Sequence, residues 1–240
     1  MKILNIIKQA IYPNHFKCAC CGKEIIYNSY DFCDKCLVKL PYISTKVCLR
    51  CGEPLSTLAN YCMHCKNDHH EFKRNFSCFS YSSPISDLIV DYKYNNKKYL
   101  SSVFIPFMVQ KYLESGITAD LIIPIPLHNE RLKSRGFNQS ELIANEFAKK
   151  LNMKSSNNIL VRIKNTPKQS LLSMEERKNN MENAFEVVSK DSVKGKTILI
   201  IDDVYTTGAT IDECAKVLKK AKAKEVYSLT IAHAIRNKAI

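Results

Sequence analysis

The sequence predicts an α/β fold with a parallel sheet, preceded by a small metal-binding module rich in cysteine. Residues 71–240 alternate short apolar runs with helix-like stretches, and most of the 11 cysteines fall before residue 66. The connections between the apolar runs are long enough for the right-handed crossovers that parallel strands require. With 45% hydrophobic and 25% charged residues, the 240-residue chain has the composition of a globular protein.

Composition divides the chain into three segments. Residues 1–16 form an amphipathic stretch that ends near Pro13, residues 17–70 hold the cysteine pairs, and residues 71–240 are expected to form the α/β domain. The first segment lacks the cleavage site of a signal peptide, and no apolar run reaches the ~18 residues of a membrane helix. We therefore expect a cytoplasmic protein without a membrane span, whose cysteines bind metal rather than form disulfides.

Four Cys-x-x-Cys pairs stand in the cysteine-rich segment, and a pair followed by glycine alternates with a plain pair. Two such pairs supply the four thiolates that tetrahedral Zn²⁺ binds at about 2.3 Å. The repeat favours two successive zinc ribbons, although a cross-braced pairing and redox-active thiols stay open as alternatives. The expected ligands are Cys18, Cys21, Cys33 and Cys36 for one zinc, and Cys48, Cys51, Cys62 and Cys65 for the other.

The remaining cysteines are not expected to bind metal. Cys20 lies between two ligands, while Cys78 and Cys214 stand in apolar surroundings and are expected to be buried. His64, His69 and His70 flank the last pair, and we interpret them as surface residues, with a ligand role as the alternative. Four thiolates leave no open coordination position, so the predicted zinc ions are structural.

Short apolar runs predict the strands of the α/β segment, and helical spacing predicts its helices. The strands are expected at Leu121–Ile125, Ile159–Ile163, Thr197–Ile201 and Glu225–Ala232. Helices are expected over Asn138–Leu151, with Asn138 as the N-cap, and from about Thr210 to Lys220. The polar stretch 164–181 is expected to be a mobile loop, or a loop that leads into a helix.

Two adjacent acids and a turn of small residues follow the strand at 197–201. Ligands of α/β folds bind at the carboxyl ends of the strands. Asp202 and Asp203 can accept hydrogen bonds from vicinal sugar hydroxyls, and the free N–H groups of a helix start favour a phosphate. The stretch therefore predicts a sugar-phosphate site; solvated acids before a capped helix are the alternative. Its phosphate loop would be Thr206, Thr207, Gly208, Ala209 and Thr210.

This stretch resembles the phosphoribosyl-pyrophosphate (PRPP) motif of type I phosphoribosyltransferases. Together with the cysteine pairs, it makes the chain similar to the ComF family of bacterial competence proteins. Three further segments carry the resemblance: IPIPLHNERLKSRGFNQSELIA at 123–144, TPKQ at 166–169 and ERKNNMENAF at 176–185. The resemblance implies a type I phosphoribosyltransferase-like domain over 71–240, which would bind PRPP together with Mg²⁺.

The resemblance also implies roles for several basic residues. Arg131 and Arg135 would bind phosphate oxygens, and the loop around Pro126–Asn129 would bind pyrophosphate. A catalytic loop over about 164–177 would close over the diphosphate with Lys164, Lys168, Gln169 and Arg177. The candidate catalytic residues are thus Asp202, Asp203, Lys168 and Arg177. The alternative for the loop around Pro126–Asn129 is that Pro124 and Pro126 simply end the strand. For Arg131 and Arg135 it is a solvated helical face, and for 164–177 an ordinary surface loop.

Two functions compete at this stage. The ComF resemblance implies a factor in natural transformation that handles incoming single-stranded DNA with an ATP-driven import helicase and other competence proteins. A net charge of +13 suits a polyanionic partner, and tyrosines near lysines can stack on bases. These are Tyr27, Tyr30, Tyr42, Tyr92, Tyr94 and Tyr99. The alternative is a catalytically active phosphoribosyltransferase of nucleotide metabolism with no DNA role; a purely structural adaptor is a third option.

Overall fold

The computed structural model describes residues 17–25, 30–43, 46–165 and 181–235. Its contacts divide the chain into two compact units, residues 1–40 and residues 41–240. The cysteine-rich segment is therefore shared between the units, with one group of four cysteines in each. The division at residue 70 that composition suggests stays a prediction.

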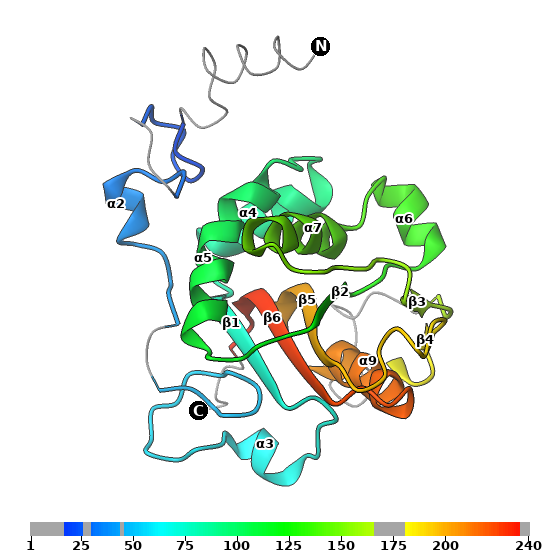
Figure 1. Ribbon diagram of the computed structural model, residues 1–240. Coiled ribbons are helices and arrows are strands. Elements are labelled where there is room, and N and C mark those ends of the chain that lie inside the picture. Colours follow the sequence, from blue (N-terminus) through cyan, green and yellow to red (C-terminus); the bar gives the residue numbers. More distant parts are fainter. Residues whose placement is uncertain (1–16, 26–29, 44–45, 166–180, 236–240) are drawn as a thin grey trace. The chain divides into compact units, whose positions relative to one another are not determined.

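A parallel four-stranded sheet forms the centre of the unit 41–240 (Figure 1). Its strand order is β1-β6-β5-β2, with β5 and β6 in the middle. The strands are β1 (Arg74–Ser80), β2 (Leu121–Pro124), β5 (Thr197–Tyr205) and β6 (Glu225–His233). Ile122 also bridges to Ser155, which extends the sheet beyond β2. The parallel sheet predicted from the sequence is confirmed.

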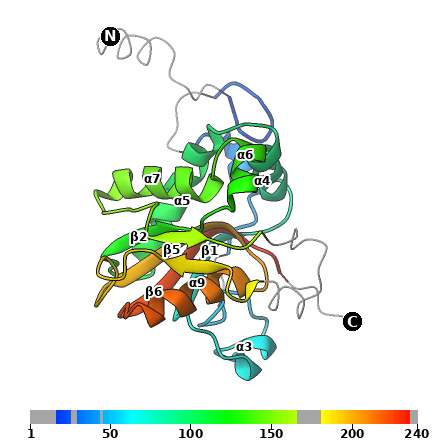
Figure 2. The ribbon, with the colours of Figure 1, turned by 90° about the vertical axis from the view of Figure 1, so that its right-hand side faces the viewer.

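Helices cover both faces of this sheet. In Figure 2, α4, α5 and α7 lie on one face and α9 lies on the other. The bounds are α4 (Ile85–Tyr94), α5 (Leu100–Glu114), α6 (Asn129–Arg135), α7 (Gln139–Leu151) and α9 (Ala209–Lys220). The start of α7 is confirmed, since the Asn138 side chain accepts a hydrogen bond from Ser140 N at 3.1 Å. The start of α9 brings the predicted phosphate loop to the end of β5.

Two strands differ from expectation. The run at 159–163 does form β3 (Leu160–Arg162), but β3 pairs antiparallel with β4 (Phe185–Val187) in a separate two-stranded sheet. The predicted strand at 197–201 continues to Tyr205, because β6 lies beside it over its whole length and Tyr205 stands opposite His233. Asp202 and Asp203 therefore belong to the strand rather than to a turn after it.

The unit 1–40 contains little regular structure in its described part. It holds the short helix α2 (Asp34–Leu37) and a bridge between Lys17 and Glu24. Phe32 and Leu40 are buried. So few apolar side chains provide a small core, which is the usual situation of domains folded around a metal. Within the described residues of the chain, no helix is long and apolar enough to cross a membrane.

Candidate ligand site and metal centres

The eight predicted zinc ligands form two groups. In each group, the sulfur atoms all lie within 4.8 Å of one another, and the members are Cys18, Cys21, Cys33 and Cys36 in one and Cys48, Cys51, Cys62 and Cys65 in the other. Four thiolates at about 2.3 Å from a tetrahedral zinc lie about 3.8 Å apart. The Sγ atoms of Cys21 and Cys33 are 3.8 Å apart, and those of Cys51 and Cys62 are 3.7 Å apart. Both groups therefore fit structural zinc, and the sequential pairing is confirmed.

Glycine turns shape the first pair of each group. Gly22 and Gly52 have φ angles of 69° and 80°, as the Cys-x-x-Cys-Gly pattern predicted. Each glycine N–H donates to the carbonyl of the first cysteine of its pair, Cys18 or Cys48. This turn folds the two thiolates toward one metal. Cys20 is not part of either group, whereas Cys78 and Cys214 are buried, as expected.

The second metal centre, formed by Cys48, Cys51, Cys62 and Cys65, is joined to the sheet of its own unit. Asn75 in β1 is fully buried and donates a hydrogen bond to the Cys51 carbonyl at 2.9 Å. The Asn75 side chain also accepts from Ser228 in β6 at 2.8 Å. Gly52 stands so close that a side chain there would meet the Asn75 carbonyl oxygen at 2.8 Å. The centre is therefore anchored to β1 and to its neighbour β6.

The two predicted ribose-binding acids have different partners. Asp202 Oδ1 accepts hydrogen bonds from Ser140 Oγ at the start of α7 and from the Asp203 amide, both at 2.9 Å. Asp203 Oδ1 forms an ion pair with Lys93 Nζ of α4 at 2.7 Å. Three elements, β5, α4 and α7, therefore fix the acid pair at the carboxyl end of the sheet.

Burial and the neighbouring charge disfavour the ionised form of Asp202. Burial, and then the negative charge of Asp203, raise the pKa of Asp202 to about 7, against the opposing effects of Lys93 and Ser140. Burial alone would lower the pKa of Lys93, but the charge of Asp203 and its hydrogen bond outweigh it and raise that pKa. Lys93 is thus a firmly charged counter-ion for Asp203.

One atom of the pair has no hydrogen bond. Asp203 Oδ2 is buried and has no partner among the residues that the structure describes. A buried acceptor of this kind costs free energy unless a ligand or water satisfies it. The site therefore offers an acceptor for a hydroxyl donor.

The predicted phosphate loop, residues 206–210, turns sharply between β5 and α9. Gly208 is the N-cap of α9 with a φ angle of 85°, and a side chain there would clash with the Tyr205 hydroxyl. The ring of Tyr205 stacks on His233 at 4.8 Å and meets Phe72 edge-on at 6.2 Å. Tyr205 therefore packs against the loop and supports it. The Thr207 hydroxyl accepts a hydrogen bond from Ala209 N at 3.4 Å.

Three arginines interact with one another, and one of them, Arg162, is close enough to Asp202 to interact with its charge. Burial, and then the charge of Arg135, lower the pKa of Arg131, and burial followed by the charge of Arg131 lowers the pKa of Arg162 to about 10. The charge of Asp202 acts in the opposite direction and raises the pKa of Arg162. Arg135 donates a hydrogen bond to Gln139 and stacks over Tyr94 at 5.3 Å. The predicted Arg131 and Arg135 therefore form one basic cluster, to which Arg162 belongs as well.

Sequence reasoning missed three residues of this site: Lys93, Ser140 and Arg162. Lys93 stands in DLIVDYKY, where a lysine four residues after the apolar Ile89 lies on the buried side of a helix. A lysine on the buried side of a helix was therefore the signal in the sequence that could have identified Lys93 as a partner of a buried acid. Of the predicted residues, Lys168, Gln169 and Arg177 lie outside the described part of the chain, and Lys164 is exposed.

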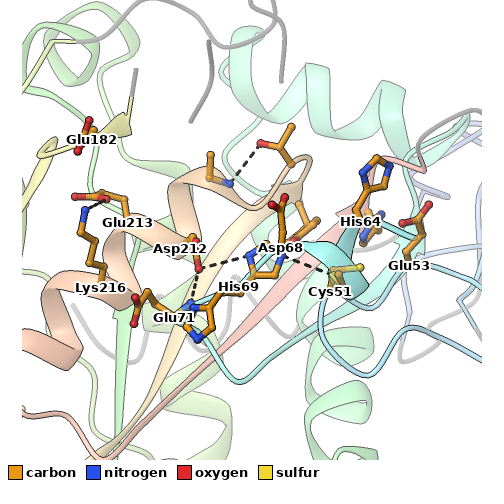
Figure 3. Close-up of a pocket in the computed structure, with 16 residues that line it drawn as sticks. Cys51, Glu53, His64, Asp68, His69, Glu71, Glu182, Asp212, Glu213 and Lys216 are labelled. Atoms are coloured by element: carbon orange, nitrogen blue, oxygen red, sulfur yellow. Dashed lines mark hydrogen bonds and ion pairs between the residues drawn. The ribbon is translucent and has the colours of Figure 1, made fainter. Parts of the chain in front are cut away.

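A cavity of about 370 Å³ lies next to the phosphate loop (Figure 3). Thr207, Ala209 and Asp212 line it from the loop and α9, and Cys65 and His70 line it from the second metal centre. The helix α3 (Met63–Asn67) carries Cys65. The cavity therefore stands between a metal ligand and the first turn of α9.

Comparison with known proteins identifies the family. The double zinc ribbon domain matches residues 7–66, and the phosphoribosyl transferase domain matches residues 136–239. Competence protein ComFC of Bacillus subtilis (strain 168) is 31% identical over 214 residues, which cover 83% of this chain and 82% of that protein. The chain belongs to the ComF family.

Other ComF relatives match along nearly the whole chain. Competence protein F of Haemophilus influenzae is 29% identical, over 92% of this chain and 98% of that protein. DNA utilization protein YhgH of Escherichia coli (strain K12) is 28% identical, over 88% of this chain and 95% of that protein. The predicted fold class, a phosphoribosyltransferase-type α/β domain with an N-terminal double zinc ribbon, is confirmed for this ComF chain.

Proposed function

We propose that this ComF chain binds PRPP with Mg²⁺ where β5 meets α9, and acts in natural transformation by handling incoming single-stranded DNA. The observation that carries the ligand is the acid pair beside the predicted phosphate loop, with Asp203 Oδ2 buried and lacking a donor among the described residues. Vicinal ribose hydroxyls supply such donors, and the helix start suits the 5′-phosphate.

Each part of the site has a role in this proposal. Asp202 and Asp203 accept the ribose hydroxyls, and Lys93 holds Asp203 in place through their ion pair. The loop Thr206, Thr207, Gly208, Ala209 and Thr210 holds the 5′-phosphate. Arg131, Arg135 and Arg162 provide positive charge for the diphosphate. Mg²⁺, when bound with PRPP, neutralises the diphosphate oxygens.

Exposed tyrosines beside basic residues support the DNA role. Tyr94 and Tyr99 are 61% and 59% exposed, and they flank Lys97 and Lys98 in the turn between α4 and α5. Arg135 lies over the Tyr94 ring. Single strands bind such combinations by base stacking and phosphate neutralisation. We therefore place the DNA contact on this turn, next to the PRPP site.

The other predicted tyrosines are less suited to contact DNA. Tyr92 is fully buried and donates a hydrogen bond to the Gln139 carbonyl at 2.7 Å, so it is excluded. Tyr42 packs on Phe79 and Phe107. Tyr30 is half-buried, and Tyr27 lies outside the described residues.

The cellular part of the proposal follows the printed names of the relatives, "Competence protein F" and "DNA utilization protein". We propose that the chain works in the cytoplasm, where incoming DNA arrives as a single strand. An ATP-driven import helicase and other competence proteins are its proposed partners there.

A thermal-shift experiment with PRPP and Mg²⁺ tests the ligand. PRPP should stabilise the wild-type protein, since a ligand that binds only the folded state raises its stability by mass action. The double variant Asp202→Ala, Asp203→Ala should lose this shift and keep its zinc. An equal shift in wild type and double variant would place the ligand elsewhere.

A salt titration tests DNA binding. The logarithm of the binding constant for a single-stranded oligonucleotide should fall with the logarithm of salt concentration, with a slope of about −0.7 per phosphate contacted. The pair Tyr94→Ala, Tyr99→Ala should weaken binding at every salt concentration, whereas Tyr61→Ala, at a tyrosine beside the second metal centre that is 40% exposed, serves as control. Binding that does not depend on salt would refute the DNA role.

The second candidate is an active phosphoribosyltransferase of nucleotide metabolism without a DNA role. The basic cluster of Arg131, Arg135 and Arg162 favours it, because positive charge near a leaving diphosphate is what such a reaction requires. Lys168 and Arg177 would act in catalysis together with Asp202 and Asp203. Release of pyrophosphate from PRPP in the presence of a nucleobase, combined with absent DNA binding, would support this candidate.

A further inference from the structure

The second metal centre is connected to the helix that starts at the phosphate loop. Cys65 Sγ lies 3.7 Å from His70 Nε2, and His70 Nδ1 lies 3.6 Å from Asp212 Oδ1. The same Asp212 oxygen accepts a hydrogen bond from the Glu71 amide at 2.7 Å (Figure 3). Asp212 stands in the first turn of α9, and its own amide donates to the Gly208 carbonyl at 2.8 Å. Three successive contacts, two of them at 3.6–3.7 Å and one a backbone hydrogen bond, thus lead from a metal ligand to the loop.

A second connection runs through aromatic rings. The His70 ring packs on Phe72 at 4.9 Å, and the fully buried Phe72 meets Tyr205 edge-on. Tyr205 lies directly under Gly208. The segment 70–72 therefore contacts the chain on both sides of the loop, at Tyr205 before it and at Asp212 after it.

We propose that zinc in the second centre positions the phosphate loop, so that zinc and PRPP each strengthen the binding of the other; this rests on the proposed PRPP function. A zinc ribbon owes its fold to the metal, so the position of segment 70–72 depends on zinc. Residues in contact with metal ligands are held in place together with them. A loop that is already ordered binds phosphate without the entropic cost of ordering. His70 is the positioning residue at the centre of both connections.

For the removal of Asp212, electrostatics alone and the proposed positioning role predict opposite changes in PRPP affinity. Asp212 carries a negative charge near the predicted phosphate position, so its removal should tighten PRPP binding if charge alone matters. If Asp212 instead holds α9 against the ribbon, Asp212→Ala should weaken binding. The direction of the change therefore distinguishes the two effects.

The experiment compares His70→Phe with His69→Phe. Phenylalanine at 70 keeps a ring to pack on Phe72 and loses both polar contacts, whereas His69 is an exposed neighbour that also lines the cavity. We expect His70→Phe to bind PRPP about 5- to 10-fold more weakly by calorimetry, with two zinc ions per chain retained. His69→Phe should bind like the wild type.

Zinc release supplies the reciprocal measurement. Coupling between two ligands acts equally in both directions, so saturating PRPP should strengthen zinc binding in the wild type against a colorimetric chelator. His70→Phe should lose this protection. A role of His70 in general stability would change zinc release to the same extent with and without PRPP.

Hydrogen exchange of the amides at 206–210, measured without PRPP, separates this proposal from the proposed function. Faster exchange in His70→Phe than in His69→Phe supports the connection between the second metal centre and the loop, even if the wild type does not bind PRPP. A wild type that does not bind PRPP would refute only the proposed ligand. Equal exchange, equal PRPP affinity and equal zinc protection in the two variants would overturn the connection. Tighter PRPP binding by Asp212→Ala would overturn it as well.

Discussion

Replacement of Asp202 by asparagine should make the protein more stable and abolish its binding of PRPP. Asparagine keeps the oxygen that accepts hydrogen bonds from Ser140 and from the Asp203 amide. It removes the negative charge of the half-buried Asp202 that stands beside the buried Asp203. The change therefore tests whether the acid pair costs stability in the absence of a ligand.

The magnitude follows from the pKa of Asp202, which burial and the charge of Asp203 raise from 3.8 to about 7. A displacement of that size corresponds to about 4 kcal/mol, and solvent screening of a partly exposed carboxylate reduces it to about 2 kcal/mol. Between about pH 4 and 7 the folded protein holds a proton that the unfolded chain has lost. The free energy of unfolding should therefore fall as the pH rises through this window and level off above it.

Urea or thermal unfolding at several pH values measures how the free energy of unfolding depends on pH. At pH 8, Asp202→Asn should raise the free energy of unfolding by about 2 kcal/mol, or Tm by roughly 4–8 °C, and at pH 4 it should have no effect. The PRPP-induced thermal shift should disappear. Asp203→Asn is the matched control with the opposite sign, because it leaves Lys93 without its counter-ion. Destabilisation by Asp202→Asn at pH 8 would refute the reasoning.

Two further substitutions test the supports of the site. Lys93→Met should lower the free energy of unfolding, measured by urea unfolding, by about 3 kcal/mol, because it leaves a buried carboxylate unpaired. Adding Asp203→Asn should recover most of this loss. A loss that persists in the double variant would argue against the ion pair. Gly208→Ala should weaken PRPP binding and lower Tm, since its side chain would clash with Tyr205. Gly195→Ala also has a positive φ but open space, so it should cost only about 1–2 kcal/mol and leave PRPP affinity unchanged in calorimetry.

The metal ligands were predictable because their signals are local, and the local motif of the proposed phosphate loop stays a prediction. A Cys-x-x-Cys-Gly turn fixes two thiolates within a few residues, and the repeat of the pairs gave the sequential pairing that the structure confirms. Gly208 and the acids before it are likewise consecutive in the chain. Such motifs can be interpreted without knowledge of the fold.

The partners of these motifs could not be predicted. Lys93 lies more than 100 residues before Asp203 in the sequence, and only the packing of α4 near the end of β5 brings them to 2.7 Å. The strand at 160–162 has the apolar pattern of a sheet strand, but its pairing with β4 outside the main sheet places Arg162 near Asp202. Pairing between distant segments leaves no periodic signal in either one.

By itself, the sequence determined which chemistry the chain carries: eight thiolates in pairs, two adjacent acids, and a small-residue turn before a helix. The tertiary structure alone decided how these groups affect one another. It placed the half-buried Asp202 next to the buried Asp203, supplied Lys93 as a counter-ion, and brought His70, which contacts the second metal centre, to the first turn of α9. The physical reason is that charge interactions and burial depend on distance in space, whereas a motif records only distance along the chain.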